Sequence, residues 1–125
     1  TMLSPKLVEG QVAGGIVQGL GATLMEGIVY DRNTGQMVNG SMVDYMVPTI
    51  ADLPQFELAH TETPAPFNPF GIKGVGESGV IGASAAVANA LSDALSPYGV
   101  EINRIPIKPE TIWRSLQEKR NTATG

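Results

Sequence analysis

The chain has 125 residues, the size of one modest domain, and 42% of them are hydrophobic, as in globular proteins. Its formal net charge of −4 argues against a nucleic-acid partner, because phosphate binding needs clustered basic residues and only Lys119 and Arg120 are adjacent. The absence of cysteine excludes disulfides and cysteine-ligated metals, and one histidine, His60, cannot form a zinc site alone.

The first predicted element is a helix over residues 7–26. Its apolar residues recur at steps of four, the spacing of one helix face: Val8, Val12, Ile16, Leu20 and Leu24. The same stretch holds five glycines, each of which costs about 1 kcal/mol relative to alanine in a helix. Such a helix makes sense if its glycines let another backbone or a ligand lie against it.

The middle of the chain predicts little regular structure. Residues 28–38 read as strand, turn and strand, and residues 56–60 alternate weakly like a strand. Residues 41–54 predict an ordered loop with a short helical turn, in which Asp44 and Tyr45 anchor the backbone by hydrogen bonds and Asp52 is a turn residue. Three prolines then forbid regular structure as far as residue 70: Pro64, Pro66 and Pro69.

The last third predicts an alanine-rich helix over residues 80–95, a strand over residues 102–107 and a final helix. The final helix begins at Pro109, since proline is tolerated in the first turn of a helix. Helices combined with a few short strands predict an α+β fold, in which the helices pack on a small mixed or antiparallel sheet.

Residues 71–79 form a glycine-rich stretch, Gly-Ile-Lys-Gly-Val-Gly-Glu-Ser-Gly. Glycine lets the main chain approach a ligand closely, and Glu77, held in such a turn, is a candidate catalytic base. Two other interpretations stay open. Residues 74–79 match the dinucleotide-binding pattern G-x-G-x-x-G, although prolines stand where that pattern needs a buried strand. The stretch could also be a turn that only starts a helix.

Four segments of the chain match longer motifs in a fixed order. Residues 8–21 resemble V-E-G-Q-x-x-G-G-x-x-Q-G-x-G, and residues 44–54 resemble D-Y-x-x-P-T-x-x-D-x-P. Residues 71–79 resemble G-x-K-G-x-G-E-x-G, and residues 109–113 resemble P-E-x-[IV]-W. Together they resemble the molybdenum hydroxylases, the xanthine dehydrogenase/aldehyde oxidase family, with the large subunit of aerobic carbon-monoxide-dehydrogenase-type enzymes as the nearest type.

The resemblance implies a molybdenum-dependent oxidoreductase and assigns roles to residues. The family's active-site base, which lies beside the molybdenum, maps onto Glu77. The family glutamine that hydrogen-bonds the pterin cofactor maps onto Gln11, whose amide can both donate and accept. The backbone that approaches the pterin matches Lys73, Gly74, Val75 and Gly76. No residue of the chain is expected to ligate the metal.

The family's large subunit is several times longer, so the resemblance implies that residues 1–125 are a C-terminal fragment of a molybdenum-cofactor-binding domain. The complete enzyme is expected to carry molybdenum-molybdopterin in its cytosine dinucleotide form, and the isolated chain to bind none and to be inactive. Expected partners are the remainder of the large subunit, iron-sulfur and flavin subunits in an oligomer, and a small-molecule substrate.

No membrane span is expected, because no apolar run approaches the ~20 residues of a membrane-spanning helix. No signal-peptide pattern is present, and we expect a cytoplasmic protein. The alternative to an enzyme portion is a non-catalytic interaction or assembly module that retains the fold.

Overall fold

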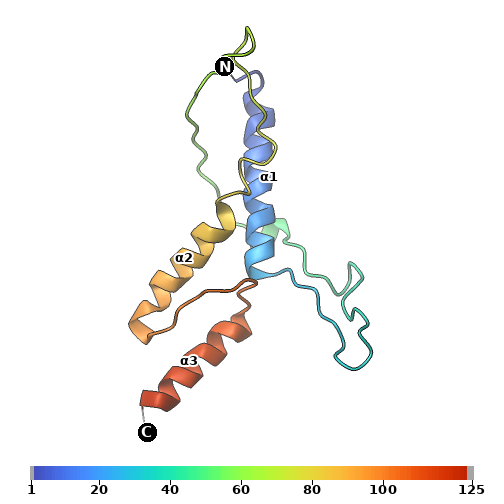
Figure 1. Ribbon diagram of the computed structural model, residues 1–125, viewed down its shortest axis with the longest axis vertical. Coiled ribbons are helices and arrows are strands. Elements are labelled where there is room, and N and C mark those ends of the chain that lie inside the picture. The colour runs from blue at the N-terminus through green and yellow to red at the C-terminus, as the bar shows by residue number, and fades with distance from the viewer. Residues whose placement is uncertain (1, 124–125) are drawn as a thin grey trace.

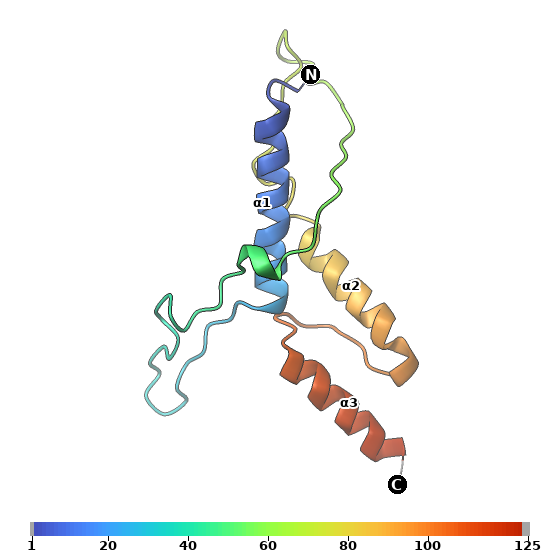
Figure 2. The same ribbon diagram turned by 180° about the vertical axis from the view of Figure 1, so that it is seen from behind.

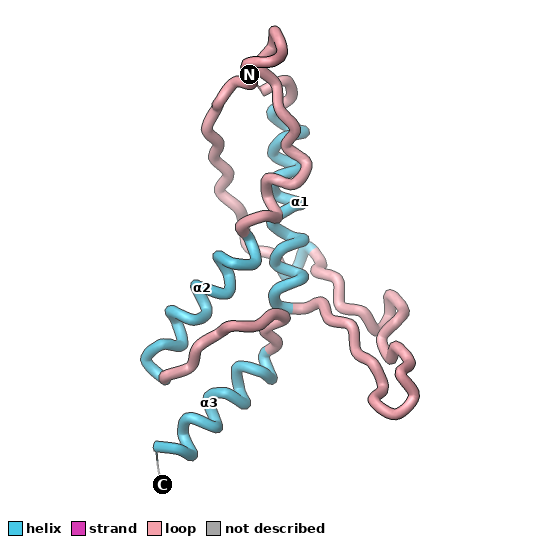
Figure 3. The backbone as a smooth tube through the Cα atoms, in the orientation of Figure 1, coloured by secondary structure: helices cyan, strands magenta, loops and turns pink. Residues whose placement is uncertain are grey.

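The computed structural model of the protein describes residues 2–123, which contain three α-helices joined by long irregular segments (Figures 1 and 3). The helices are α1 (Pro5–Leu24), α2 (Ala83–Leu95) and α3 (Pro109–Ala123). Two short 3-10 turns, η1 (Ile50–Asp52) and η2 (Ser96–Tyr98), complete the regular structure. The three predicted helices and the short helical turn within residues 41–54 are therefore confirmed.

The glycines of α1 allow the start of α2 and the segment before it to lie directly on the helix. Gly15 and Gly19 are buried. A methyl group at Gly15 would lie 2.9 Å from both the Cα of Gly79 and the amide nitrogen of Val80. Ser84 Oγ also donates a hydrogen bond to the Gly19 carbonyl over 3.3 Å. The helix therefore meets the glycine-rich stretch at backbone-to-backbone distance, which explains glycines that weaken the helix by themselves.

Two other glycines of α1 face open space. A methyl group at Gly10 or Gly14 would meet no atom within 4 Å, other than neighbouring residues and the helix's own backbone. These positions lie about one helical turn apart, on a part of α1 that the described residues leave uncovered. Their glycines are not explained by packing within residues 2–123.

Few side chains are buried, and the two largest that are fully buried lie where the C-terminal end of α1 meets the segment before α3. Thr23 and Ile107 are 0% and 1% exposed, and the Ile107 amide donates a 2.6 Å hydrogen bond to the Thr23 carbonyl. The accessible surface is 9684 Å². A compact protein of 13.1 kDa is expected to expose roughly 6,400 Å². The described chain therefore leaves much more surface uncovered than a self-contained domain does.

An arm formed by residues 25–49 projects away from α2 and α3 (Figures 1 and 2). Its two sides are joined by an antiparallel bridge between Tyr30 and Met37, and by the Asn39 side chain, which bonds the Val29 amide and the Gly27 carbonyl. At the tip, Asp31 Oδ1 accepts hydrogen bonds from the amides of Asn33 and Thr34. These bonds lower the pKa of Asp31, with the Thr34 amide as the largest cause.

The strands expected at residues 28–38, 56–60 and 102–107 are not formed within residues 2–123, and the expected sheet is therefore not confirmed (Figure 3). A strand needs a neighbouring strand to complete its hydrogen bonds, and these segments have none beyond the one bridge. In the last segment, the Ile102 amide instead donates to Ser92 Oγ of α2 over 3.1 Å.

α2 begins at Ala83 and not at residue 80, because residues 80–82 form a turn. Within the described part of the chain, no helix is both long and apolar enough to cross a membrane.

Candidate functional site

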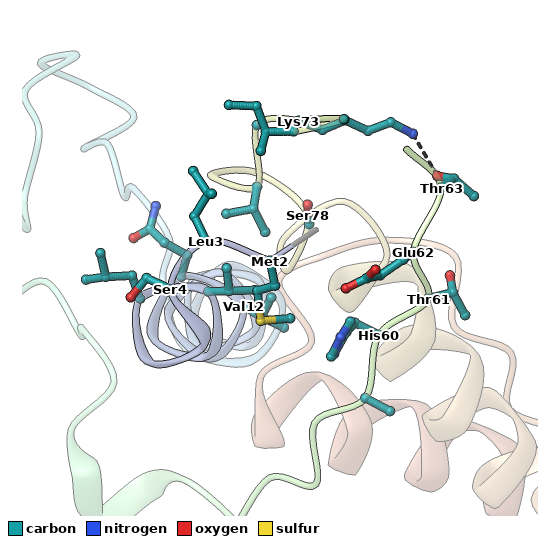
Figure 4. Close-up of a pocket in the computed structure, with 18 residues that line it drawn as sticks. Met2, Leu3, Ser4, Val12, His60, Thr61, Glu62, Thr63, Lys73 and Ser78 are labelled. Atoms are coloured by element: carbon teal, nitrogen blue, oxygen red, sulfur yellow. Dashed lines mark hydrogen bonds between the residues drawn. The ribbon is translucent and has the colours of Figure 1, made fainter. Parts of the chain in front are cut away.

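A groove of about 600 Å³ lies between the N-terminal half of α1 and two irregular segments, residues 59–63 and 71–75 (Figure 4). Leu7, Val8 and Val12 give the α1 wall an apolar surface, and Gln11 adds an amide to it. The opposite wall is polar and includes His60. The groove therefore pairs apolar contact area with convergent polar groups, which is typical of small-molecule and cofactor sites.

The polar wall is tied to the glycine-rich segment by a lysine. Lys73 Nζ donates a 2.7 Å hydrogen bond to Thr63 Oγ1, the contact drawn as a dashed line in Figure 4. In the same view, His60 and Glu62 face Met2 and Val12 across the groove. Lys73 thus holds together the two irregular segments that form this wall.

The glycine-rich segment is fixed at its beginning by Asn68. Asn68 Oδ1 accepts a hydrogen bond from the Ile72 amide over 3.1 Å, and Asn68 Nδ2 donates to the Ile72 carbonyl over 3.0 Å. The Ala65 amide also donates to the Gly71 carbonyl over 3.1 Å. Gly71 has φ +65°, a left-handed conformation that favours glycine.

The other end of the segment is fixed on α1. Gly79 is buried, and a methyl group there would collide with the Val12 carbonyl oxygen. Between these fixed ends, the backbone amides of residues 73–77 donate to no acceptor within residues 2–123. The segment therefore presents a row of free donors between two firm attachments.

The structure brings most of the predicted site residues together. Four of them line the groove: Gln11, Lys73, Gly74 and Val75. Gly76 lies beside Gln11, since a methyl group on Gly76 would be 3.7 Å from Gln11 Nε2. Two segments that are far apart in the sequence therefore meet at one edge of the groove.

Glu77 is exposed and does not line the groove. Its carbonyl accepts a hydrogen bond from the Val80 amide over 3.2 Å, while its carboxylate has no hydrogen-bond partner within the described residues. α2 begins only at Ala83, so Glu77 precedes the helix. A helix dipole acts most strongly within the first turn of the helix, and Glu77 lies outside that turn. The role of Glu77 as a base stays a prediction.

Sequence reasoning missed part of the site. His60, Thr63 and Glu62 form the polar wall, and none of them belongs to a motif. Asn68 was also missed, although asparagine between two prolines is a residue that commonly hydrogen-bonds nearby backbone in turns. Long-range placement of an irregular segment leaves no periodic signal in the sequence.

The second matched segment anchors the arm instead of contributing to the groove. Tyr45 OH donates a 2.7 Å hydrogen bond to Glu26 Oε2 at the end of α1, which raises the pKa of Tyr45. Asp44 Oδ2 accepts from Ser41 Oγ, and Asp52 Oδ2 accepts from both the amide and the hydroxyl of Thr49. The expectation that Asp44 and Tyr45 hold the loop by hydrogen bonds is confirmed, and so is the expectation that Asp52 is a turn residue.

Two other features bear on metal binding and on dinucleotide binding. No group of three or more potential metal ligands is present among residues 2–123. No strand precedes the G-x-G-x-x-G match within that range, so the arrangement that dinucleotide binding requires is missing.

Comparison with known proteins identifies the chain's relatives. Residues 1–54 match the family model described as a molybdopterin cofactor-binding domain. The chain is 46% identical over 116 residues to the nicotine 6-hydroxylase large subunit of Paenarthrobacter nicotinovorans, covering 93% of this chain. It is 33% identical over 118 residues to the carbon monoxide dehydrogenase large chain of Hydrogenophaga pseudoflava, covering 94%.

Solved structures agree with these matches. The crystal structure of quinoline 2-oxidoreductase from Pseudomonas putida 86 matches with a TM-score of 0.88 and 50% identity, over 94% of this chain and 15% of that chain. A Cu,Mo-CO dehydrogenase structure matches with a TM-score of 0.87 and 31% identity, over 96% of this chain and 15% of that chain.

The chain belongs to the molybdenum hydroxylase large-subunit family, and its match is to the C-terminal part of those subunits. It spans only 14% of the length of the nicotine 6-hydroxylase large subunit and 15% of the carbon monoxide dehydrogenase large chain. The relatives are molybdenum-dependent dehydrogenases and oxidoreductases; two are named as molybdenum-binding subunits, and a third is named as subunit gamma of the 6-hydroxypseudooxynicotine dehydrogenase complex.

Proposed function

We propose that this chain supplies the cofactor-contacting edge and the proton-accepting carboxylate of a molybdopterin-dependent hydroxylase. The observation that carries the proposal is the meeting of Gln11 on α1 with Gly76 of the glycine-rich segment. The resemblance assigns both residues to the cofactor, and the fold places them side by side at one groove. In this proposal residues 1–125 act as a C-terminal part of the large subunit.

The residues present fit a pterin. Its ring edge offers both hydrogen-bond donors and acceptors, which suits the Gln11 amide and the free backbone amides of residues 73–77. Gly74 has nothing within 4 Å of where a side chain would begin, so the backbone there is open to a ligand. Lys73, Gly74, Val75 and Gly76 would then hold the cofactor mainly through the main chain.

When bound, the molybdenum centre would supply the oxygen transfer and take up the two electrons of the oxidation. Glu77 would act as the general base, accepting a proton on one carboxylate oxygen during the attack on the substrate. Its carboxylate has no hydrogen-bond partner within residues 2–123, so no contact of the described chain occupies the oxygens that this role needs. The remainder of the large subunit would exclude water from this side of the groove.

The comparisons favour an electron-poor nitrogen heteroaromatic as substrate. The relatives with 46% and 50% identity are named for nicotine and quinoline, whereas the carbon monoxide dehydrogenases are 30–33% identical. Both named compounds contain an aromatic ring with nitrogen, beside which the ring carbon is electron-poor. We therefore favour this substrate class over carbon monoxide.

The proposal also covers the wider assembly. The cofactor would be the cytosine dinucleotide form, iron-sulfur and flavin subunits would carry electrons onward, and the enzyme would be a cytoplasmic oligomer. The segments at residues 28–38, 56–60 and 102–107 would gain strand neighbours from the remainder of the large subunit, completing the expected sheet.

The test is Glu77→Gln in the complete large subunit, assembled with its partner subunits. The amide keeps the shape of the side chain and removes the base, so turnover should fall by roughly 10²–10⁴-fold while molybdenum content stays constant. Glu57→Gln, at another exposed glutamate outside the groove, is the matched control. Unchanged turnover in Glu77→Gln would remove this residue from the mechanism.

A non-catalytic assembly module is the alternative function. It is favoured only by the position of Glu77 outside the groove lining. Full incorporation of molybdenum in Glu77→Gln together with normal turnover would support it.

A further inference from the structure

The segment between η1 and α2 carries two exposed aromatic side chains. Residues 64–72, here called the aromatic loop, include Phe67, which is 90% exposed, and Phe70, which is 69% exposed. Figures 1 and 2 show this part of the chain passing the N-terminal end of α1, with its tip projecting beyond the helix. Large aromatic side chains with so much surface in water are costly unless another surface covers them.

The base of the aromatic loop is closed by its own hydrogen bonds. Three of them join Ala65 to Gly71 and Asn68 to Ile72, with lengths of 3.0–3.1 Å. The Gly71 amide adds a fourth bond to the Asn68 carbonyl over 3.2 Å. Ala65 is buried at 7% exposure, so the closed base is also packed. The two phenylalanines are therefore displayed by a loop that is already ordered, which lowers the entropic cost of docking.

The polypeptide that covers them is indicated by the comparisons. The described backbone superposes with a TM-score of 0.88 on 15% of a crystallised chain, so it has the shape that such a segment takes beside a much longer remainder. The excess of roughly 3,300 Å² over the surface of a compact protein of this size exceeds what a standard protein–protein interface hides on one partner. An extensive surface of the same subunit is needed to cover it.

We infer that the aromatic loop inserts Phe67 and Phe70 into an apolar pocket on the remainder of the large subunit, and that this docking fixes the glycine-rich segment. The inference rests on the proposed function for the identity of that partner. The mechanical link is Asn68, whose side chain bonds both backbone groups of Ile72, the residue directly before Lys73. Holding the loop therefore holds the start of residues 73–77.

The test measures binding of the 125-residue chain to the large-subunit polypeptide that lacks these residues. Buried aromatic anchors at interfaces commonly contribute 2 kcal/mol or more, so Phe67→Ala and Phe70→Ala should each weaken the affinity by at least about thirtyfold. Phe67→Leu, which keeps an apolar side chain, should retain most of the affinity. Far-UV circular dichroism checks that helix content is unchanged, as expected for two exposed side chains.

Hydrogen exchange provides a second readout that does not depend on activity. In the wild-type complex the amides of residues 73–77 should be protected, and the double variant Phe67→Ala/Phe70→Ala at saturating partner should lose that protection. Equal protection in both would overturn the link between docking and the glycine-rich segment.

The remaining outcomes separate the two proposals. If the wild-type chain does not bind the partner polypeptide, the proposed function and the inference both fail. If it binds and the phenylalanine variants bind equally well, only the inference fails. If the variants abolish self-association of the chain but leave partner binding unchanged, a second copy covers the loop and the inference is overturned.

Discussion

Gln11 and Gln18 lie on the same helix and are both exposed, but only Gln11 lines the groove. In the complete enzyme, Gln11→Ala would remove one hydrogen bond to the cofactor, whereas Gln18→Ala would remove none. A single hydrogen bond contributes about 1 kcal/mol, so cofactor affinity should fall roughly fivefold to tenfold in Gln11→Ala only. Molybdenum analysis after dialysis measures the difference. Equal losses in the two variants would contradict the assignment of Gln11.

The contact between Asp52 and Thr49 is expected to depend on pH. The Thr49 amide, and then the Thr49 hydroxyl, lower the pKa of Asp52 below its ordinary value of 3.8. Because the folded pKa is the lower one, this contact stabilises the turn above the ordinary pKa and is lost as pH falls through the folded pKa.

A titration of the Thr49 amide NMR resonance should therefore show a midpoint below 3.8. Thr49→Val removes the hydroxyl donor and keeps the amide, so the midpoint should move part of the way back. A wild-type midpoint at or above 3.8 would contradict the contact.

Which single residues lie at the groove could be predicted only where a motif carried them. Lys73, Gly74 and Val75 were predicted and line the groove, because a short glycine-rich stretch is local in sequence. Asn68 and Thr63 were not predicted, because their partners are set by how an irregular, proline-rich segment folds back on itself. No periodicity or propensity encodes such a path.

At the scale of elements, the contact between α1 and the glycine-rich segment allows a paired experiment on adjacent glycines. Gly15→Ala would place a methyl group 2.9 Å from the backbone of Gly79 and Val80, and should destabilise the chain by about 1–3 kcal/mol through overpacking. Gly14→Ala meets no atom within 4 Å and should stabilise α1 by up to about 1 kcal/mol. Urea unfolding followed by circular dichroism measures both. Opposite shifts of the midpoint support the packing, and equal shifts contradict it.

The helices were predictable and the strands were not, for a physical reason. A helix satisfies its backbone within one segment, so its apolar spacing and the proline at Pro109 are sufficient signals. A strand satisfies its backbone against another segment. At residues 28–38 the alternation and turn residues are present, but only the Tyr30–Met37 bridge forms within the described chain.

At the scale of the whole molecule, the uncovered apolar surface predicts that the isolated chain associates with itself. Exposed residues such as Ile28, Val43 and Trp113 would be brought together in water. Size-exclusion chromatography should show species larger than 13.1 kDa that grow with concentration. Co-expression with the rest of a large subunit should reduce them. A clean monomer at low micromolar concentration, with no binding of an apolar dye, would contradict this prediction.

The bare positions at Gly10 and Gly14 have a consequence for protein engineering. Alanine at these positions would stabilise α1 in the isolated chain. It would also fill space that the described chain leaves empty, where a covering polypeptide would lie in the complete enzyme. A screen for heat resistance of the 125-residue chain would therefore reward substitutions that obstruct assembly of the complete enzyme. Selection for joint performance with the partner polypeptide avoids that outcome.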